Sequence, residues 1–113
     1  MAGVLTYCKI QEMEVSPTMA RYLQEIESKV ELGNLLAISL SGIPILELFT
    51  KRVAPHTRIQ EIGEYDWEQF GTAMSSVHSN TRRLVNNIAD DARLFSKNQQ
   101  EVKFWGCVYD ATR

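Results

Sequence analysis

Two histidines and two cysteines are the residues of this 113-residue chain best suited to acid–base, nucleophilic or metal chemistry. His56 lies in a polar stretch, and His78 lies on the flank of a helical pattern. A general base needs a group that orients it, and no carboxylate is spaced to serve either histidine. Two histidines without nearby ligands cannot close a metal site either. We therefore predict that the chain is not an enzyme and has no catalytic, metal-binding or cofactor-binding residue.

Cys8 and Cys107 lie near opposite ends of the chain, at a spacing that matches neither a disulfide framework nor a metal motif. We expect two reduced, partly buried thiols that pack as small apolar side chains, with a disulfide or a reactive thiol as alternatives. The N-terminus has no basic flank followed by an apolar core, so no secretory signal is indicated. Residues 35–49 are too short and interrupted to span a membrane. These features predict a cytoplasmic protein without a membrane span.

Basic residues gather at two places, which suggests either ordinary solvated surface or a docking patch for an acidic partner or for RNA phosphates. The residues of this possible patch are Lys51, Arg52 and Arg58 in the polar stretch, and Arg82 and Arg83 in a helical pattern. The net charge of −2 makes a generic nucleic-acid binder less favoured, because such proteins usually carry a basic excess.

The hydrophobic pattern around these residues predicts one α+β domain over residues 1–113. A loosely alternating stretch, 4–14, is typical of a strand. Ser16 as N-cap and Pro17 at the first helical position then predict a helix that ends at Gly33. Its apolar residues recur at steps of four and three: Met19, Leu23, Ile26 and Val30.

Two strands, 35–40 and 43–49, are predicted on either side of a Ser-Gly turn, followed by a polar connection over 51–64. A second long helix is expected to open at Asp66, with Gln69 completing a capping-box-like pair. Its predicted stripe contains Phe70, Met74, Val77, Thr81, Leu84 and Ile88, and two further strands are expected over 92–96 and 101–109. The predicted order is β-α-β-β-α-β-β, a mainly antiparallel sheet with two principal helices.

Small residues recur every four positions along the second predicted helix, at Gly71, Ser75 and Ser79. This stripe is either a plain solvent-facing surface or a face that another helix or sheet approaches closely. Aromatic residues on the last predicted strand, Trp105 and Tyr109, could extend such a contact. We take these five residues as the candidate partner or dimer interface.

The block from Ser16 to Tyr109 resembles a roadblock/LC7 or longin-like module. The resemblance is carried by the segment Leu36-Ala37-Ile38-Ser39-Leu40-Ser41-Gly42-Ile43-Pro44-Ile45 and by the small-residue helix around 71–75. It implies a homodimer or heterodimer joined through edge strands and the second helix. It also implies a non-enzymatic scaffold for small GTPases, motor complexes or trafficking machinery. The strand-like 4–14 and the long 51–64 depart from the family's pattern.

Three functional hypotheses follow. The first is a protein-interaction or dimerisation module that serves as a scaffold. The alternative is an RNA-binding protein with a ferredoxin-like fold, since β-α-β-β-α-β is also that fold's order, which would use basic residues 51–58 with Arg82 and Arg83. Aromatic residues of 101–109 could stack bases there, although no RNP1-like run is present. A third, minor hypothesis is an enzyme in which 51–64 covers a pocket containing His56.

Overall fold

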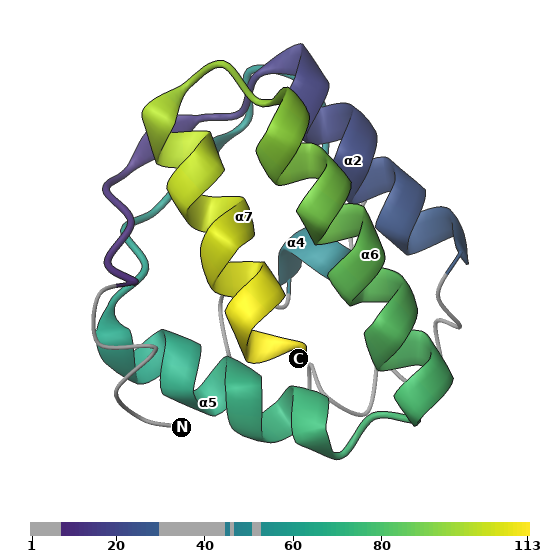
Figure 1. Cartoon of the computed structure of the whole chain (residues 1–113). Coiled ribbons are helices and arrows are strands. Elements are labelled where there is room, and N and C mark those ends of the chain that lie inside the picture. Colours follow the sequence, from purple (N-terminus) through teal and green to yellow (C-terminus); the bar gives the residue numbers. More distant parts are fainter. Residues whose placement is uncertain (1–7, 30–44, 46, 51–52) are drawn as a thin grey trace.

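The structure is a computed structural model that describes residues 8–29, 45, 47–50 and 53–113. It is mainly helical (Figure 1), so the predicted sheet-dominated α+β fold is wrong. The helices are α2 (Pro17–Lys29), α4 (Glu47–Thr50), α5 (Glu64–Ser75), α6 (Ser79–Phe95) and α7 (Gln99–Ala111). Within the described ranges, the only sheet is one antiparallel pair, β1 (Met13–Glu14) with β2 (Arg58–Ile59).

Helix α2 confirms the first predicted helix at its start. The Ser16 hydroxyl accepts a hydrogen bond from the Met19 backbone N–H at 3.1 Å, as an N-cap residue does. Pro17 is the first helical residue, where its missing N–H costs nothing. Three residues of the predicted stripe, Met19, Leu23 and Ile26, are buried. Val30 and Gly33 lie outside the described residues.

The predicted N-terminal strand is much shorter than 4–14. Met13 pairs with Ile59, and a single bridge joins Ile10 to Ile62. The partner segment falls inside 51–64, which was expected to be only a connection. The predicted strand 35–40 lies outside the described residues, and where the return strand 43–49 is described, α4 is helical instead.

The second predicted helix is two helices joined by a turn. Helix α5 begins one residue after Gly63, whose N–H donates to the Asp66 carboxylate at 3.0 Å, so Asp66 lies in the first turn and is not the N-cap. Ser76 ends α5, and the His78 imidazole accepts from the Asn80 N–H at 3.1 Å to cap α6. An uninterrupted apolar stripe in the sequence concealed this break.

The two strands predicted near the C-terminus are also wrong. Residues 92–96 are the last turn of α6 and its C-cap, and 101–109 lie within α7. The Asn98 side chain caps α7 by accepting from the N–H groups of Gln100 and Glu101. Aromatic and β-branched residues favoured a strand here, yet the buried positions of α7 recur at helical steps. They are Glu101, Phe104, Trp105, Cys107 and Val108.

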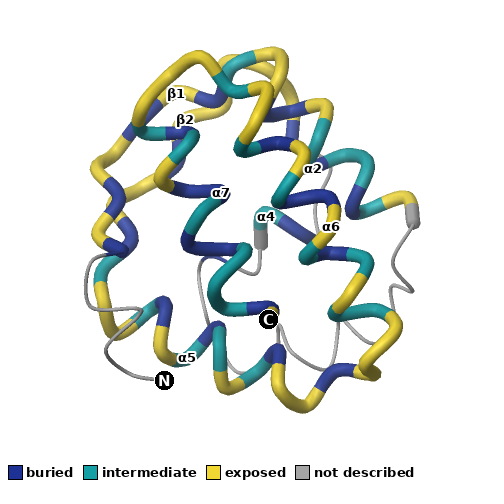
Figure 2. Tube along the Cα trace, viewed as in Figure 1, coloured by how far each residue is buried: buried dark blue, intermediate teal, exposed yellow. Residues whose placement is uncertain are grey.

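Helices α6 and α7 run antiparallel, α2 lies on the other side of α6, and α5 crosses near the C-terminal end of α7 (Figure 1). Their inward faces enclose one buried cluster, while exposed positions lie along the outside (Figure 2). Ring contacts run through its centre in the order Tyr22, Trp105, Phe104, Trp67, Phe70 and Phe49. This aromatic centre fixes the position of α7 against α2, α4 and α5.

Candidate functional site

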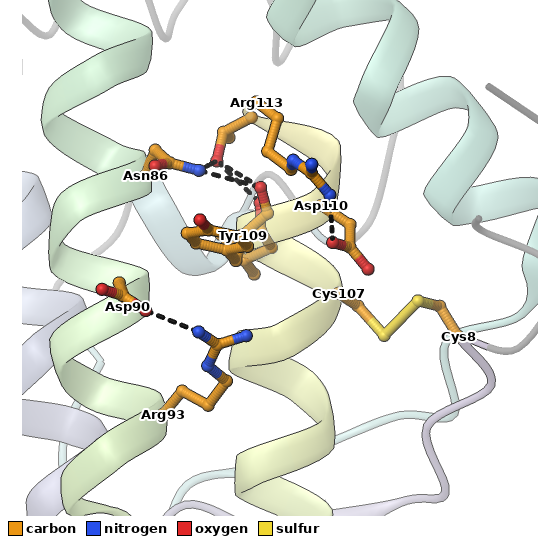
Figure 3. Close-up of polar contacts among 10 residues, drawn as sticks. Cys8, Asn86, Asp90, Arg93, Cys107, Tyr109, Asp110 and Arg113 are labelled. Carbon is orange, nitrogen blue, oxygen red and sulfur yellow. Dashed lines mark hydrogen bonds and ion pairs between the residues drawn. A yellow bond between two sulfur atoms is a disulfide. The ribbon is translucent and has the colours of Figure 1, made fainter.

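The candidate functional site is the outward side of the α6–α7 pair, centred on Tyr109. Its half-buried ring packs against the core from α7. The guanidinium carbon of Arg93, on α6, lies 4.6 Å from the ring centroid, and that of Arg113 lies 5.8 Å from it. Each contact is a cation–π interaction, worth about 0.5–1 kcal/mol where it is exposed. We name Arg93, Tyr109 and Arg113 the Arg-Tyr-Arg cluster (Figure 3).

Two aspartates hold the guanidinium groups of this cluster. Arg93 makes an ion pair with Asp90 at 2.6 Å, one turn earlier on α6. Arg113 makes a longer pair with Asp110 at 3.5 Å (Figure 3). Each aspartate precedes its arginine by three residues. On α6 this spacing places Asp90 and Arg93 on neighbouring positions of the helix, and Arg113 follows the end of α7. The cluster is therefore a preset arrangement of charge around an aromatic ring.

Hydrogen bonds of the Asn86 side chain join the C-terminal end of α7 to α6. Its side-chain amide donates to the Tyr109 carbonyl at 2.9 Å and to the Thr112 hydroxyl at 3.2 Å (Figure 3). The Thr112 hydroxyl in turn donates to the Val108 carbonyl at 2.8 Å. These bonds satisfy carbonyls at the end of the helix and join the backbone from Val108 to Thr112, which includes Tyr109, to α6.

Two large apolar side chains are exposed at the C-terminal end of α6, the helix that carries Arg93. Leu94 is 70% exposed and Phe95 is 65% exposed, and both follow Arg93 directly on α6. Leu94 also lies four residues after Asp90, on the same face of the helix. Tyr65, on α5, is the other large hydrophobic residue of the described ranges that is exposed to this extent, at 68%. Leu94 therefore lies next to the Arg-Tyr-Arg cluster, whereas Phe95, two residues after Arg93, lies on another face of α6. Tyrosine and arginine, the side-chain types of the cluster, are enriched at protein interfaces.

The predicted interface residues are not brought together. Gly71 and Ser75 lie on α5, whereas Ser79 is the first residue of α6, so the three do not form one helical stripe. Trp105 is fully buried in the aromatic centre, and only Tyr109 lies at the candidate site.

The predicted basic patch is also divided. Arg58 is on β2, where it pairs with Glu12 at 3.6 Å, and Arg82 and Arg83 are near the start of α6. The β1–β2 pair and the start of α6 lie at opposite ends of the molecule (Figures 1 and 2). Lys51 and Arg52 lie outside the described residues.

The inward side of α7 joins it to the N-terminal segment. Cys8 and Cys107 form a disulfide, so the expectation of two reduced thiols is wrong and the alternative pairing holds. Ser16 donates to the buried Glu101 carboxylate through its hydroxyl at 2.8 Å and through its N–H at 3.3 Å. Glu101 therefore lies at the N-terminus of α2, where a negative group is favoured.

Arg93, Arg113 and Glu101 were not predicted from the sequence as site residues. An aspartate three residues before each arginine could have indicated the two ion pairs, but only once 90–93 was recognised as helical and 110–113 as the end of a helix. Glu101 carried no such signal, because its partner Ser16 is 85 residues away. The disulfide was hidden for the same reason, since a pairing between distant residues depends on the fold.

The structure gives one histidine a carboxylate partner that was not expected from the sequence. His56 is hydrogen-bonded to Glu14, and His78 caps α6. No group of three or more histidine, cysteine, aspartate or glutamate residues within the described ranges could hold a metal ion. No helix among those described is long and apolar enough to cross a membrane.

Comparisons with known proteins give no relative. No protein-family model, no curated protein and no solved structure matches the chain.

Proposed function

We propose that the chain is a non-enzymatic protein-binding module that docks a partner protein on the outward side of α6 and α7. The observation that carries this proposal is Leu94, exposed on the helix face of Asp90 next to the Arg-Tyr-Arg cluster, with Phe95 also exposed as the last residue of α6. Tyrosine and arginine dominate binding energy at protein interfaces, particularly where apolar neighbours exclude water. A rigid backbone beneath them lowers the entropy cost of binding.

The charge of this region indicates the kind of partner. Residues 79–113 contain six basic and four acidic side chains, although the whole chain has a net charge of −2. One of the four acids, Glu101, is buried against Ser16 and does not reach this surface. We therefore propose a partner of a different sequence, with acidic groups around an apolar spot. A two-fold pairing of two copies through this surface would bring like charges together.

The narrower partner classes stay predictions. Small GTPases, motor complexes and trafficking machinery were suggested as partners only by the family resemblance. We therefore propose a protein partner without assigning it to one of these classes. The RNA-binding alternative gains no support from the site, because Arg58 is ion-paired with Glu12 and lies far from Arg82 and Arg83. A homodimer is an outcome that the experiment below distinguishes.

The disulfide bears on the compartment. The cytoplasmic prediction was made from the absence of a secretory-signal pattern and of a membrane span, together with an expectation of reduced cysteines. Disulfides, however, persist mainly in oxidising surroundings. We infer that the module works in an oxidising compartment. Cell fractionation with antibody detection decides between the two locations.

The test is cross-linking capture from native extract with three purified proteins. These are the unchanged chain, the double variant Leu94→Ser/Phe95→Ser, and the control Tyr65→Ser, which removes an equally exposed apolar residue from α5. We expect a protein that the unchanged chain and the control capture and the double variant does not. That protein, once purified, should bind directly and more weakly as salt is raised. Equal capture by all three proteins, or cross-linking of the chain only to itself, would contradict the proposal.

A further inference from the structure

Residues 8–16, which we name the N-terminal strap, are attached to α7 at both ends. At one end Cys8 is bonded to Cys107, near the C-terminal end of α7 (Figure 3). At the other end Ser16 is hydrogen-bonded to Glu101, in the first turn of α7. The strap is thus attached to α7 at Glu101 and at Cys107, about two turns apart, and its two attachments differ in kind. One is covalent and sensitive to redox conditions, and the other is polar.

The strap is also part of the core. Its buried residues are Cys8, Ile10, Met13 and Val15. They belong to the same cluster as the aromatic centre. Its backbone is hydrogen-bonded to residues 56–62, through the mutual pair of Ile10 and Ile62 at 2.9 Å and through Val15, whose N–H donates to the Thr57 carbonyl at 2.7 Å. Release of the strap from α7 would expose apolar surface on both sides of this contact.

We propose that the redox state of Cys8 and Cys107 sets the folded fraction of the protein and the closure of the strap on α7. The bond joins residues 99 positions apart, so it closes nearly the whole chain into one loop. In the chain-entropy account, a loop of about 100 residues raises the folding equilibrium constant by about three to four orders of magnitude. Reduction should therefore remove a large part of the stability and free the strap first at Cys8.

The reaction is thiol–disulfide exchange with a dithiol reductant. One thiolate of the reductant attacks a sulfur of the pair and forms a mixed disulfide, and one cysteine leaves as a thiolate and takes up a proton. The second thiol of the reductant then closes its own disulfide and releases the other cysteine. Two electrons pass from the reductant to the pair. Both cysteines are almost fully buried, so this attack requires the Cys8 end of the strap to open.

The experiment compares thermal unfolding of the unchanged chain with and without dithiothreitol, after mass spectrometry has established the redox state. We expect reduction to lower the unfolding temperature by roughly 15 °C, or to abolish folding at 25 °C. The variant Cys8→Ala/Cys107→Ala keeps small apolar side chains and should match the reduced chain in the absence and presence of reductant. In hydrogen exchange under conditions where the reduced chain is folded, protection of the Ile10–Ile62 amides should fall before that of α6.

Three results would overturn this proposal. The first is two free thiols in the protein purified without reductant. The second is an unfolding temperature that changes by less than about 3 °C on complete reduction. The third is an alanine variant as stable as the oxidised chain.

Discussion

The two sides of α7 differ in their surroundings: one side is packed in the core, and the other side lies at the surface of the molecule. Its inward side presents Phe104, Trp105 and Cys107 to the core and the strap, and its one buried acid, Glu101, is bonded to Ser16. Its outward side presents Tyr109, which two guanidinium groups contact, and the neighbouring helix α6 leaves Leu94 exposed to solvent. The same thirteen residues therefore stabilise the fold on one side and offer a surface on the other. Substitutions on the inward side should act on stability, and those on the outward side should act on binding.

The largest effect is expected at the aromatic centre. Phe104 is fully buried and contacts both Trp67 and Trp105 edge to face, with ring centroids 5.9 and 4.9 Å away. Phe104→Ala should lower the free energy of unfolding by about 3–5 kcal/mol, because it leaves a cavity that rigid neighbours cannot fill. Chemical denaturation measures this loss. A change below 1 kcal/mol would mean that the inward side of α7 does not hold the fold together.

The next effect should come from the buried carboxylate. Glu101→Ala leaves the Ser16 N–H and hydroxyl without their partner at the start of α2 and should cost about 2–3 kcal/mol. Glu101→Gln keeps an acceptor oxygen in place and should cost clearly less. Urea unfolding of the two variants in parallel measures the difference. Equal losses would show that Glu101 contributes only its packing volume.

A smaller effect is expected at Tyr109. Tyr109→Ala removes the ring that both guanidinium groups contact and should cost about 1–2 kcal/mol. Tyr109→Phe retains the ring and should be nearly neutral for stability, since no hydrogen bond of the hydroxyl occurs within the described residues. Thermal unfolding separates the two variants. If Tyr109→Phe were as unstable as Tyr109→Ala, the contacts of the ring with Arg93 and Arg113 would not stabilise the protein.

Gly106 offers a gain in stability on the outward side. A methyl group there would lie 3.9 Å from Cδ of Arg93, an ordinary van der Waals contact. Because glycine in a helix interior is less favourable than alanine, Gly106→Ala should stabilise the protein by about 0.5–1 kcal/mol. Guanidinium unfolding checks the sign. Destabilisation would indicate that α6 and α7 approach more closely than the structure has them.

Local signals in the sequence predicted one helix well and misassigned another. Ser16 and Pro17 indicate the start of α2, and the spacing of the apolar residues that follow them fits only a helix. In α7, Phe104, Trp105 and Val108 fit either a strand by composition or a helix by spacing, and composition was given too much weight. The cap residue Asn98 was the local signal that could have decided for a helix.

The features that define the site depend on tertiary structure. Ser16 is hydrogen-bonded to Glu101, 85 residues away, and Cys8 is bonded to Cys107, 99 residues away. No spacing rule connects such residues, because their meeting depends on how α7 packs against the strap. Tyr109 was predicted as an interface residue from its type alone, and the arginines beside it could be recognised only after their helices were placed.

The most direct test of the account is the affinity of the captured partner for the unchanged chain and for Leu94→Ser/Phe95→Ser, measured by calorimetry alongside thermal unfolding. The two residues are exposed, so the variant should unfold within about 2 °C of the unchanged chain. Its affinity should be at least about tenfold lower, which corresponds to about 1.4 kcal/mol. Equal affinities in two equally stable proteins would contradict the claim that the outward side of α6 and α7 is a docking surface.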